Sequence, residues 1–186
     1  MDEIARRANV SKRTLYDFFE DKESLLIEIL RTINDPLTEQ IELLEKQVET
    51  ALEAILLFNE KIMEKPMPVC DDFWEDIKCY PKALQIMMEF KYSFIKKWVE
   101  LLKRGEKESV FMPDINYDLI SLMAQQHFIK SEQSEFFSRY TQKEVHDTFF
   151  FIFLRGISTD AGRATIDKFI VRKRYRWRDN YEVLSY

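Results

Sequence analysis

The sequence has few of the residues that interrupt regular structure, with 3 glycines and 5 prolines among 186 residues. Glycine and proline mark the many short connections of loop-rich and β-rich folds, so their scarcity argues against both classes. Helix-forming Glu, Lys, Leu and Ile are abundant instead. We therefore predict an all-α fold, in a chain long enough to bury a hydrophobic core as one large or two small domains.

Long apolar runs and paired cysteines are missing as well. No stretch approaches the length of a membrane span and no signal peptide opens the chain, so we expect a cytoplasmic protein without a membrane partner. Cys70 and Cys79 are not spaced as a C-x-x-C pair and have no histidine nearby at metal-binding spacing. We expect both thiols to be free and at least half-buried.

The residue patterns of common catalytic sites are also absent from the sequence. With Gly105, Gly156 and Gly162 as its glycines, the chain has no phosphate-binding loop and no nucleophile elbow. His127 and His146 are not paired at the spacing of zinc ligands. Acidic residues are spread over helical faces rather than gathered. We therefore expect no enzyme, no cofactor and no metal.

The start of the chain has the pattern of a helix, a tight turn and a second short helix. The small Ala5 allows the two helices to cross closely, and Asn9 stands in the turn, where a left-handed backbone is needed. Ser11 is a suitable N-cap for the second helix. The apolar residues of that helix are expected in the core, namely Leu15, Phe18 and Phe19. This is the apolar pattern of a DNA-binding helix-turn-helix.

The charges around this motif favour the same function. The net charge of −5 would repel DNA, so contact requires a local basic patch, which Arg6, Arg7, Lys12 and Arg13 can form. Lys12 and Arg13 fall in the first turn of one helix and Lys22 at the start of the next, where a cation opposes the macrodipole by roughly 0.3–1 kcal/mol. A bound phosphate would turn this cost into attraction.

The run VSKRTLYDFFEDKESLL resembles the recognition helix and the following helix of the TetR family of bacterial transcriptional regulators. The arrangement V-S-K-x-T-L-Y-x-x-F-x-x-K is far more specific than a general helix-turn-helix pattern. Family members have a further helix before the stretch that matches MDEIARRA, and we expect this chain, which starts at Met1, to lack that helix. An internal start, a shortened sequence and a variant that no longer binds DNA all fit this departure.

The resemblance implies a role for each polar residue of the second helix. In the family, the residues that match Lys12, Arg13, Thr14 and Tyr16 face the DNA, and the one that matches Lys22 lies on a phosphate. By this resemblance the first three would reach base edges or nearby phosphates, and the tyrosine hydroxyl the backbone. The predicted DNA-contacting set, N-cap included, is Ser11, Lys12, Arg13, Thr14, Tyr16 and Lys22.

Helical patterns continue beyond the motif. Asp21 can cap the next helix, which Asn34-Asp35-Pro36 should kink or interrupt. An apolar stripe with steps of three and four residues then extends to Ile62. We favour a break between Gln47 and Thr50, with Thr50 as the cap of a second helix, over one long helix or a coiled-coil seam.

Three more helices follow from the turn residues. A region closed by Pro66 and Pro68 precedes a short helix that starts at Asp71 or Asp72 and ends at Pro81. A long helix should run from Pro81 to about Arg104, with Gly105 as its stop signal, and Asp114 should open the next one. By the resemblance, residues 1–33 would form the helix-turn-helix and connecting helix, and residues 34–186 a helical effector-binding and dimerisation domain.

The resemblance also implies an effector cavity. Aromatic and methionine side chains suit apolar or aromatic ligands, although most of them would be ordinary core residues in a protein of this size. The candidates, chosen because they lie on the helices that enclose the cavity in the family, are Phe58, Met63, Trp74, Met87, Phe90, Phe94, Trp98 and His127.

The C-terminal helices suggest a dimer interface. Residues 142–156 are apolar on nearly every side, which near the end of a chain indicates a helix between the core and a partner. With the helix from Thr159 to Tyr175 it fits the four-helix dimer interface of the family. The predicted interface residues are Phe149, Phe150, Ile152, Phe153, Ile166, Phe169 and Ile170. We expect a homodimer with two-fold symmetry.

Taken together, these features predict a TetR-like repressor that leaves a palindromic operator in double-stranded DNA when a small, largely apolar effector binds. One alternative is a helical dimer that binds a ligand or a partner protein without binding DNA, and another is an activator in place of a repressor. The basic tail from Arg172 to Arg178 fits a solvated helix end, with nucleic-acid or partner binding as the alternative.

Overall fold

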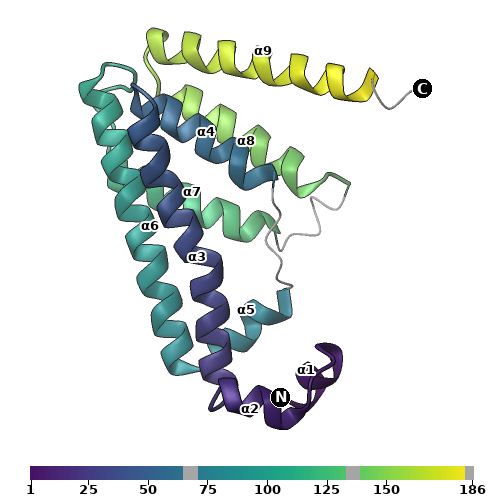
Figure 1. Cartoon of the computed structure of the whole chain (residues 1–186). Helices are drawn as coiled ribbons and strands as arrows, with labels where there is room; N and C mark the ends of the chain where they lie inside the picture. Colours follow the sequence, from purple (N-terminus) through teal and green to yellow (C-terminus); the bar gives the residue numbers. More distant parts are fainter. Residues whose placement is uncertain (65–70, 133–138, 183–186) are drawn as a thin grey trace. The chain divides into compact units, whose positions relative to one another are not determined.

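The computed structural model describes residues 1–64, 71–132 and 139–182, and most of them are helical. In chain order the helices are α1 (Asp2–Arg7), α2 (Lys12–Phe18), α3 (Lys22–Gln47), α4 (Ala51–Glu64), α5 (Asp71–Lys78), α6 (Pro81–Lys107), α7 (Tyr117–Glu132), α8 (Gln142–Gly156) and α9 (Asp160–Glu182) (Figure 1). Within these ranges the β-type pairing is an isolated bridge between Phe111 and Ser158. The predicted all-α fold is confirmed. None of the described helices has the length and apolarity needed to cross a bilayer.

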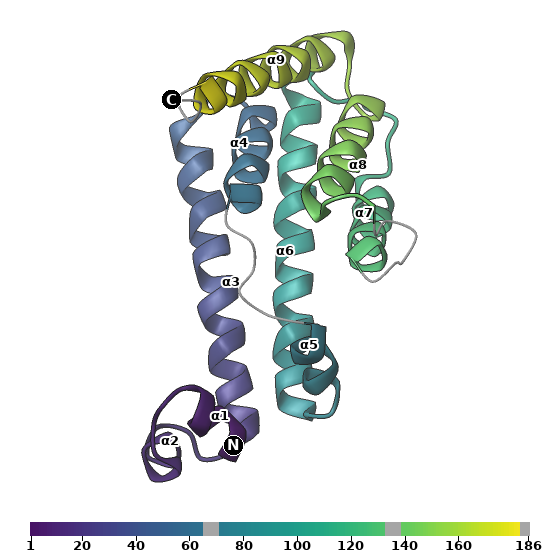
Figure 2. The same cartoon turned by 90° about the vertical axis from the view of Figure 1, so that its right-hand side faces the viewer.

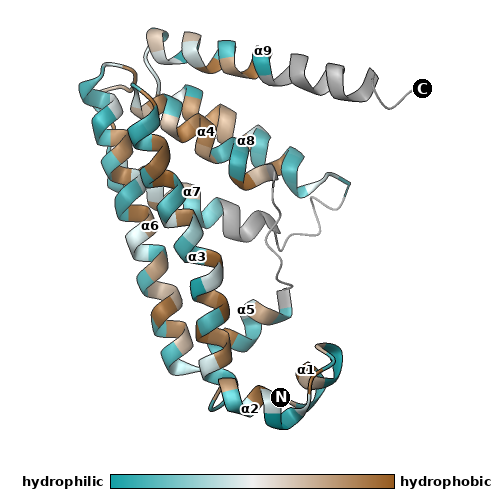
Figure 3. Ribbon diagram, viewed as in Figure 1, coloured by the Kyte–Doolittle hydropathy of each residue, from teal (hydrophilic) through white to brown (hydrophobic). Residues whose placement is uncertain are grey.

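The chain forms two compact units. The first comprises residues 1–42 with 66–94, and the second comprises residues 43–65 with 95–186, so the boundaries fall within α3 and α6. In the first unit, hydrophobic residues recur along α3 (brown in Figure 3) and pack against α5 and the start of α6. The buried centre of this cluster is Leu26, Leu30, Phe73, Ile77 and Ala83. The functional division at residue 34 stays a prediction.

Local backbone interactions form the helix-turn-helix as expected. Asn9 adopts the left-handed conformation with φ of 55°, and the Val10 N–H donates to the Ala5 carbonyl at 3.0 Å. Ser11 caps α2 because its Oγ accepts a hydrogen bond from the Thr14 N–H at 2.9 Å. The predicted turn and N-cap are therefore confirmed.

Helix α3 differs from the prediction at its proline. Asp21 caps its start, accepting from the Ser24 N–H at 2.7 Å, as expected. The helix then continues through Pro36, so the predicted interruption there is wrong. A proline inside a helix costs about 3 kcal/mol, but burial of apolar side chains on both sides of it offsets that cost. Leu30 and Ile41, which are 0% and 2% exposed, are two of those side chains.

The predicted break between α3 and α4 is confirmed. Thr50 and Glu53 form a capping box: the Glu53 N–H donates to Thr50 Oγ1 at 3.2 Å, and the Thr50 N–H donates to Glu53 Oε2 at 3.4 Å. The two residues thus satisfy backbone donors at the start of α4. The apolar stripe that the sequence shows is therefore divided between two helices.

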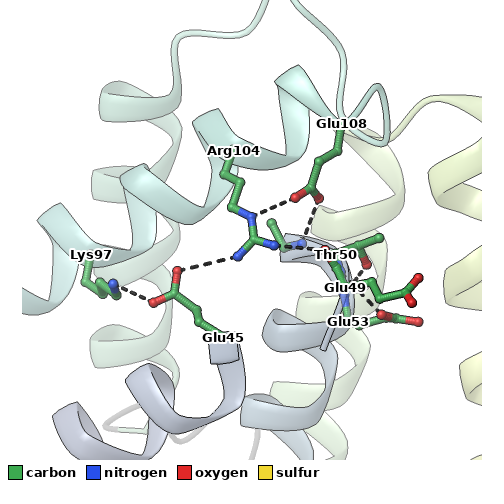
Figure 4. Close-up of polar contacts among 8 residues, drawn as sticks. Glu45, Glu49, Thr50, Glu53, Lys97, Arg104 and Glu108 are labelled. Atoms are coloured by element: carbon green, nitrogen blue, oxygen red, sulfur yellow. Dashed lines mark hydrogen bonds and ion pairs between the residues drawn. The ribbon is translucent and has the colours of Figure 1, made fainter. Parts of the chain in front are cut away.

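A polar network in the second unit holds this break against α6 (Figure 4). Arg104 donates from Nε to Glu108 Oε1 at 2.7 Å and from a terminal nitrogen to the Glu49 carbonyl at 2.8 Å. The other Glu108 oxygen accepts from the Ala51 N–H at 2.7 Å. On the other side, Glu45 pairs with Lys97 at 2.5 Å and with Arg104 at 4.0 Å. These ion pairs and hydrogen bonds therefore connect the end of α3, the start of α4 and α6.

Helix α6 continues past its predicted end. Gly105 lies inside the helix rather than beyond it, which corrects the expectation that it stops the helix. A Cβ at Gly105 would lie 2.4 Å from the Phe111 ring, so the glycine is needed for close packing. The chain reverses at Ser109, whose φ is 59°, and the N–H groups of Val110 and Phe111 both donate to the Gly105 carbonyl.

Helices α5 and α7 each differ from the prediction at one end. Helix α5 ends at Lys78, before the expected limit at Pro81. Helix α7 is opened by Asn116, whose Oδ1 accepts from the Leu119 N–H at 3.0 Å, and not by Asp114. Behind this cap, the Tyr117 hydroxyl donates to the Met112 carbonyl, and burial raises the pKa of Tyr117 to about 12.

Candidate functional site

Helix α2 presents a polar face outward and anchors itself by one side chain. Leu15 is 8% exposed, whereas Lys12, Arg13, Thr14 and Tyr16 are all exposed. Ser11 is occupied in two hydrogen bonds, because its Oγ also lies 2.7 Å from Thr14 Oγ1. The structure thus brings together five of the six predicted DNA-contacting residues on one short helix and its cap. Whether they touch DNA stays a prediction.

Two of the three residues expected in the core of α2 are not buried. Phe18 is 78% exposed and Phe19 is half-buried, so the assignment of both to the core is wrong. Periodicity places Leu15 and Phe18 on one helix face. A residue on such a face is buried only where another element packs against it. Among the described residues, other parts of the chain cover Leu15 but not Phe18.

Most of the cations of the motif are paired with acids. Lys12 Nζ lies 2.7 Å from Asp2 Oδ1, and this pair lowers the pKa of Asp2 and raises the pKa of Lys12. Glu3 pairs with Arg7 at 2.9 Å and with Arg6 at 3.5 Å. All these groups are well exposed, so water and salt weaken the pairs. No described carboxylate lies within ion-pair distance of the exposed Arg13.

Lys22, the sixth predicted DNA-contacting residue, is held by α5. Its Nζ lies 2.7 Å from Asp76 Oδ2 and 5.6 Å from the centre of the Tyr80 ring. The hydrogen bond with Asp76 raises the pKa of Lys22. Sequence reasoning missed this partner because Asp76 is 54 positions away and looks like any exposed helical acid.

The predicted effector residues fall into separate groups. In the first unit, Trp74, Met87 and Phe90 pack against the buried cluster, and Phe94 is 37% exposed. This packing accounts for the first three as hydrophobic packing residues, and the cavity stays a prediction.

In the second unit, two aromatic pairs involve predicted effector residues. Phe58 is buried and its ring centre lies 6.4 Å from that of Trp98. His127 stacks on Phe149, with ring centres 3.7 Å apart, and Met63 is half-buried. Phe58 and Trp98, both predicted for the effector site, therefore form one pair. His127 instead stacks on Phe149, which was predicted for the dimer interface.

Sequence reasoning missed two buried polar side chains in the second unit. Asn59 on α4 is 4% exposed and Ser121 on α7 is 3% exposed. Among the described residues, neither Asn59 Nδ2 nor Ser121 Oγ has a hydrogen-bond partner. The sequence signal for Asn59 was an amide residue beside the apolar stripe of its helix. Its burial without a partner for Nδ2 is unusual, because buried polar groups are nearly always hydrogen-bonded.

The predicted interface residues are only partly at the surface. Helix α8 packs against both α7 and α9 (Figure 2). Phe150, Ile166 and Phe169 are buried within the second unit itself, whereas Ile152 is 65% exposed. The remaining three, Phe149, Phe153 and Ile170, are half-buried. The interface stays a prediction, and its exposed part on α8 is centred on Ile152.

The remaining predicted features give no further site. Cys79 is a free and exposed thiol, so the expectation that it is at least half-buried is wrong. Pro66, Pro68 and Cys70 lie outside the described residues, as do the side chains of the basic tail beyond Arg172. In the described part of the chain, no group of His, Cys, Asp and Glu side chains could hold a metal ion.

Comparison with known proteins identifies the motif and the fold. Residues 1–29 match the family described as bacterial regulatory proteins, tetR family. No curated protein matches the chain. Among solved structures, the ketosteroid transcriptional regulator KstR2 of Mycobacterium tuberculosis is similar with a TM-score of 0.57 and 22% identity, covering 84% of this chain and 83% of that one. TylP, a TetR regulator from Streptomyces fradiae, has a TM-score of 0.50 and 17% identity, covering 96% of this chain and 80% of its own. The start of the chain, residues 1–29, is thus similar to the tetR family of bacterial regulatory proteins, and the chain shares its fold with these two regulators.

Proposed function

We propose that the chain is a homodimeric repressor that binds a palindromic operator through the two copies of α2 and is released by a small, largely apolar effector. The observation that carries this proposal is that Lys12, Arg13, Thr14 and Tyr16 are exposed on α2. The buried Leu15 anchors this helix and Ser11 caps it. Two-fold symmetry of the protein would match the symmetry of the operator. In this proposal, residues 1–33 bind DNA and residues 34–186 bind the effector and the second subunit.

The polar residues of α2 differ in what they offer to DNA. Arg13 can donate two parallel hydrogen bonds to a guanine edge, and it has no acidic partner among the described residues that it would have to leave. Lys12 would exchange Asp2 for a phosphate, at small cost because the pair is exposed. Thr14 and Tyr16 carry hydroxyls that suit phosphate oxygens.

The first test is Arg13→Ala. We expect operator affinity to fall about tenfold or more, because a bidentate contact to a base contributes about 1–3 kcal/mol, and the dependence of affinity on salt to flatten. The measurement is fluorescence anisotropy of the intact protein on DNA from its own promoter across a salt series. Sedimentation in parallel reports whether each variant is a folded dimer.

The matched control is Arg31→Ala, at a residue outside the predicted basic patch. Arg31 is an exposed arginine of α3 that pairs with Glu28, and its loss changes the net charge by the same amount. A drop in affinity equal to that of Arg13→Ala would show a general charge effect and contradict the role of Arg13. A folded dimer that binds no promoter DNA in any form would instead favour the helical dimer that binds a ligand or partner without DNA.

For the effector, the proposal is supported by the surroundings of Asn59. Asn59 follows Phe58 along α4, Phe58 pairs with Trp98, and the buried Nδ2 of Asn59 has no hydrogen-bond partner among the described residues. An apolar ligand with one hydrogen-bond acceptor would satisfy that donor. KstR2 is described as a ketosteroid regulator, and a ketosteroid, an apolar ring system with carbonyl acceptors, belongs to the same broad class.

This view of Asn59 predicts a gain in stability on its removal. Asn59→Leu should raise the free energy of unfolding of the ligand-free protein by about 1 kcal/mol, because an apolar side chain of similar size replaces a buried amide whose Nδ2 lacks a partner. Urea denaturation measures the change. A loss of stability would mean that the amide is bonded in the ligand-free protein and would remove it as a candidate for effector recognition.

A further inference from the structure

Two consecutive residues fasten the start of α3 to the elements packed beside it in the first unit. The Lys22 ammonium reaches Asp76 of α5 at 2.7 Å. Glu23 accepts backbone hydrogen bonds from Lys82 at 2.7 Å and from Ala83 at 3.4 Å, at the start of α6. The point where the helix-turn-helix meets α3 is therefore also the point where α5 and α6 are attached.

The Lys22–Asp76 pair is more protected than the other ion pairs of the motif. The Lys22 side chain is 29% exposed and that of Asp76 is 45% exposed, against 58% and 74% for Lys12 and Asp2. The Tyr80 ring lies 5.6 Å from the ammonium and shields it further. Partial burial reduces screening by salt, so this pair persists where the exposed pairs weaken.

A DNA phosphate at Lys22 would meet the Asp76 carboxylate. An ammonium has three donors and could touch both groups, but the two anions repel each other at that distance. A bound phosphate therefore gains less from Lys22 than from a lysine without an acidic partner. Conversely, each step that moves the carboxylate away makes Lys22 a better phosphate ligand.

We infer that Asp76 is a negative determinant of DNA affinity, a residue of α5 that competes with an operator phosphate for the Lys22 ammonium. The inference rests on the proposed binding of DNA by α2 and the start of α3. Because two ligands of one group affect each other equally, docking of α5 on α3 and binding of the operator oppose each other. Any partner or effector that shifts α5 would then change DNA affinity through one ion pair.

The test is Asp76→Asn, which keeps the shape of the side chain and removes its charge. We expect operator binding about threefold to tenfold tighter at 0.15 M salt, and a plot of log affinity against log salt steeper by about 0.9, the increment of one phosphate contact. The measurement is anisotropy of the intact protein on its promoter DNA. Circular dichroism melting confirms that the variant is folded.

The control and the double variant separate competition from general charge. Glu75→Gln removes the same charge from the neighbouring residue of α5, where Glu75 pairs with Lys78 at 2.6 Å, and should change affinity less than twofold. In a Lys22→Met background, Asp76→Asn should bring no gain. Equal effects of the two α5 variants, or a gain that persists without Lys22, would overturn the inference while leaving the proposed function intact. No binding by any variant would overturn both.

Discussion

Replacing Gly162 by alanine is expected to lower the free energy of unfolding by about 3 kcal/mol or more, the largest effect among the three glycine-to-alanine replacements. A Cβ at Gly162 would lie 2.1 Å from the Val110 carbonyl oxygen and 3.0 Å from the Ser158 Cβ. Overpacking normally costs about 1–3 kcal/mol when side chains can adjust. Here the nearest atom belongs to the backbone, which adjusts less.

The backbone at this contact is fixed by hydrogen bonds on both sides. The Val110 carbonyl accepts from the Thr159 N–H at 3.1 Å, and the Met112 N–H donates to the Ile157 carbonyl at 2.9 Å. Thr159 also donates from its hydroxyl to the Ser109 carbonyl at 2.8 Å. A methyl group could be accommodated only by breaking some of these bonds, which would leave their donors and acceptors without their present partners.

The other glycines provide graded controls in the same urea denaturation experiment. Gly156 has nothing within 4 Å of the position of a Cβ and lies at the end of α8, so Gly156→Ala should stabilise the protein by about 0.5–1 kcal/mol. Gly105→Ala should be destabilising, since its Cβ would meet the Phe111 ring at 2.4 Å. Equal stability of the Gly162 and Gly156 variants would contradict the close packing at Gly162.

The sequence predicted best what neighbouring residues decide among themselves. Asn9 in the turn, Ser11 at the start of α2 and Thr50 at the start of α4 all act within a few residues, so their local chemistry was sufficient. The same is true of the exposed row on α2, which follows from the helical period once Leu15 is placed inside.

Features that depend on distant parts of the chain could not be predicted in this way. Gly105 was expected to end α6, but Phe111 packs against it and the helix continues. Phe18 has the apolarity and spacing of a core residue, yet burial requires a covering element. Lys22 was assigned to phosphate alone, since nothing in a local pattern identifies Asp76 as its partner.

Arg104→Ala is expected to lower the free energy of unfolding by about 2 kcal/mol, the second largest effect. The variant leaves Glu108 and Glu45, which are 23% and 20% exposed, without the guanidinium that lies between them. It also leaves the Glu49 carbonyl without its donor. Losing one partner of a half-buried charge costs more than the pair contributes, because the remaining carboxylates stay where water reaches them poorly.

The neighbouring Lys103 shows why position matters more than charge. It pairs with Asp118 at 2.9 Å, but the two side chains are 52% and 69% exposed, so Lys103→Ala should cost less than about 1 kcal/mol. The loss in free energy of unfolding for Arg104→Lys should lie between the losses for the two alanine variants. An ammonium can bind one carboxylate but cannot donate to both Glu108 and the Glu49 carbonyl in the fork geometry of arginine. Urea denaturation of the three variants at equal salt measures this order. Equal losses for Lys103→Ala and Arg104→Ala would mean that the joint between α3, α4 and α6 gains no more from its charges than a solvent-exposed pair does.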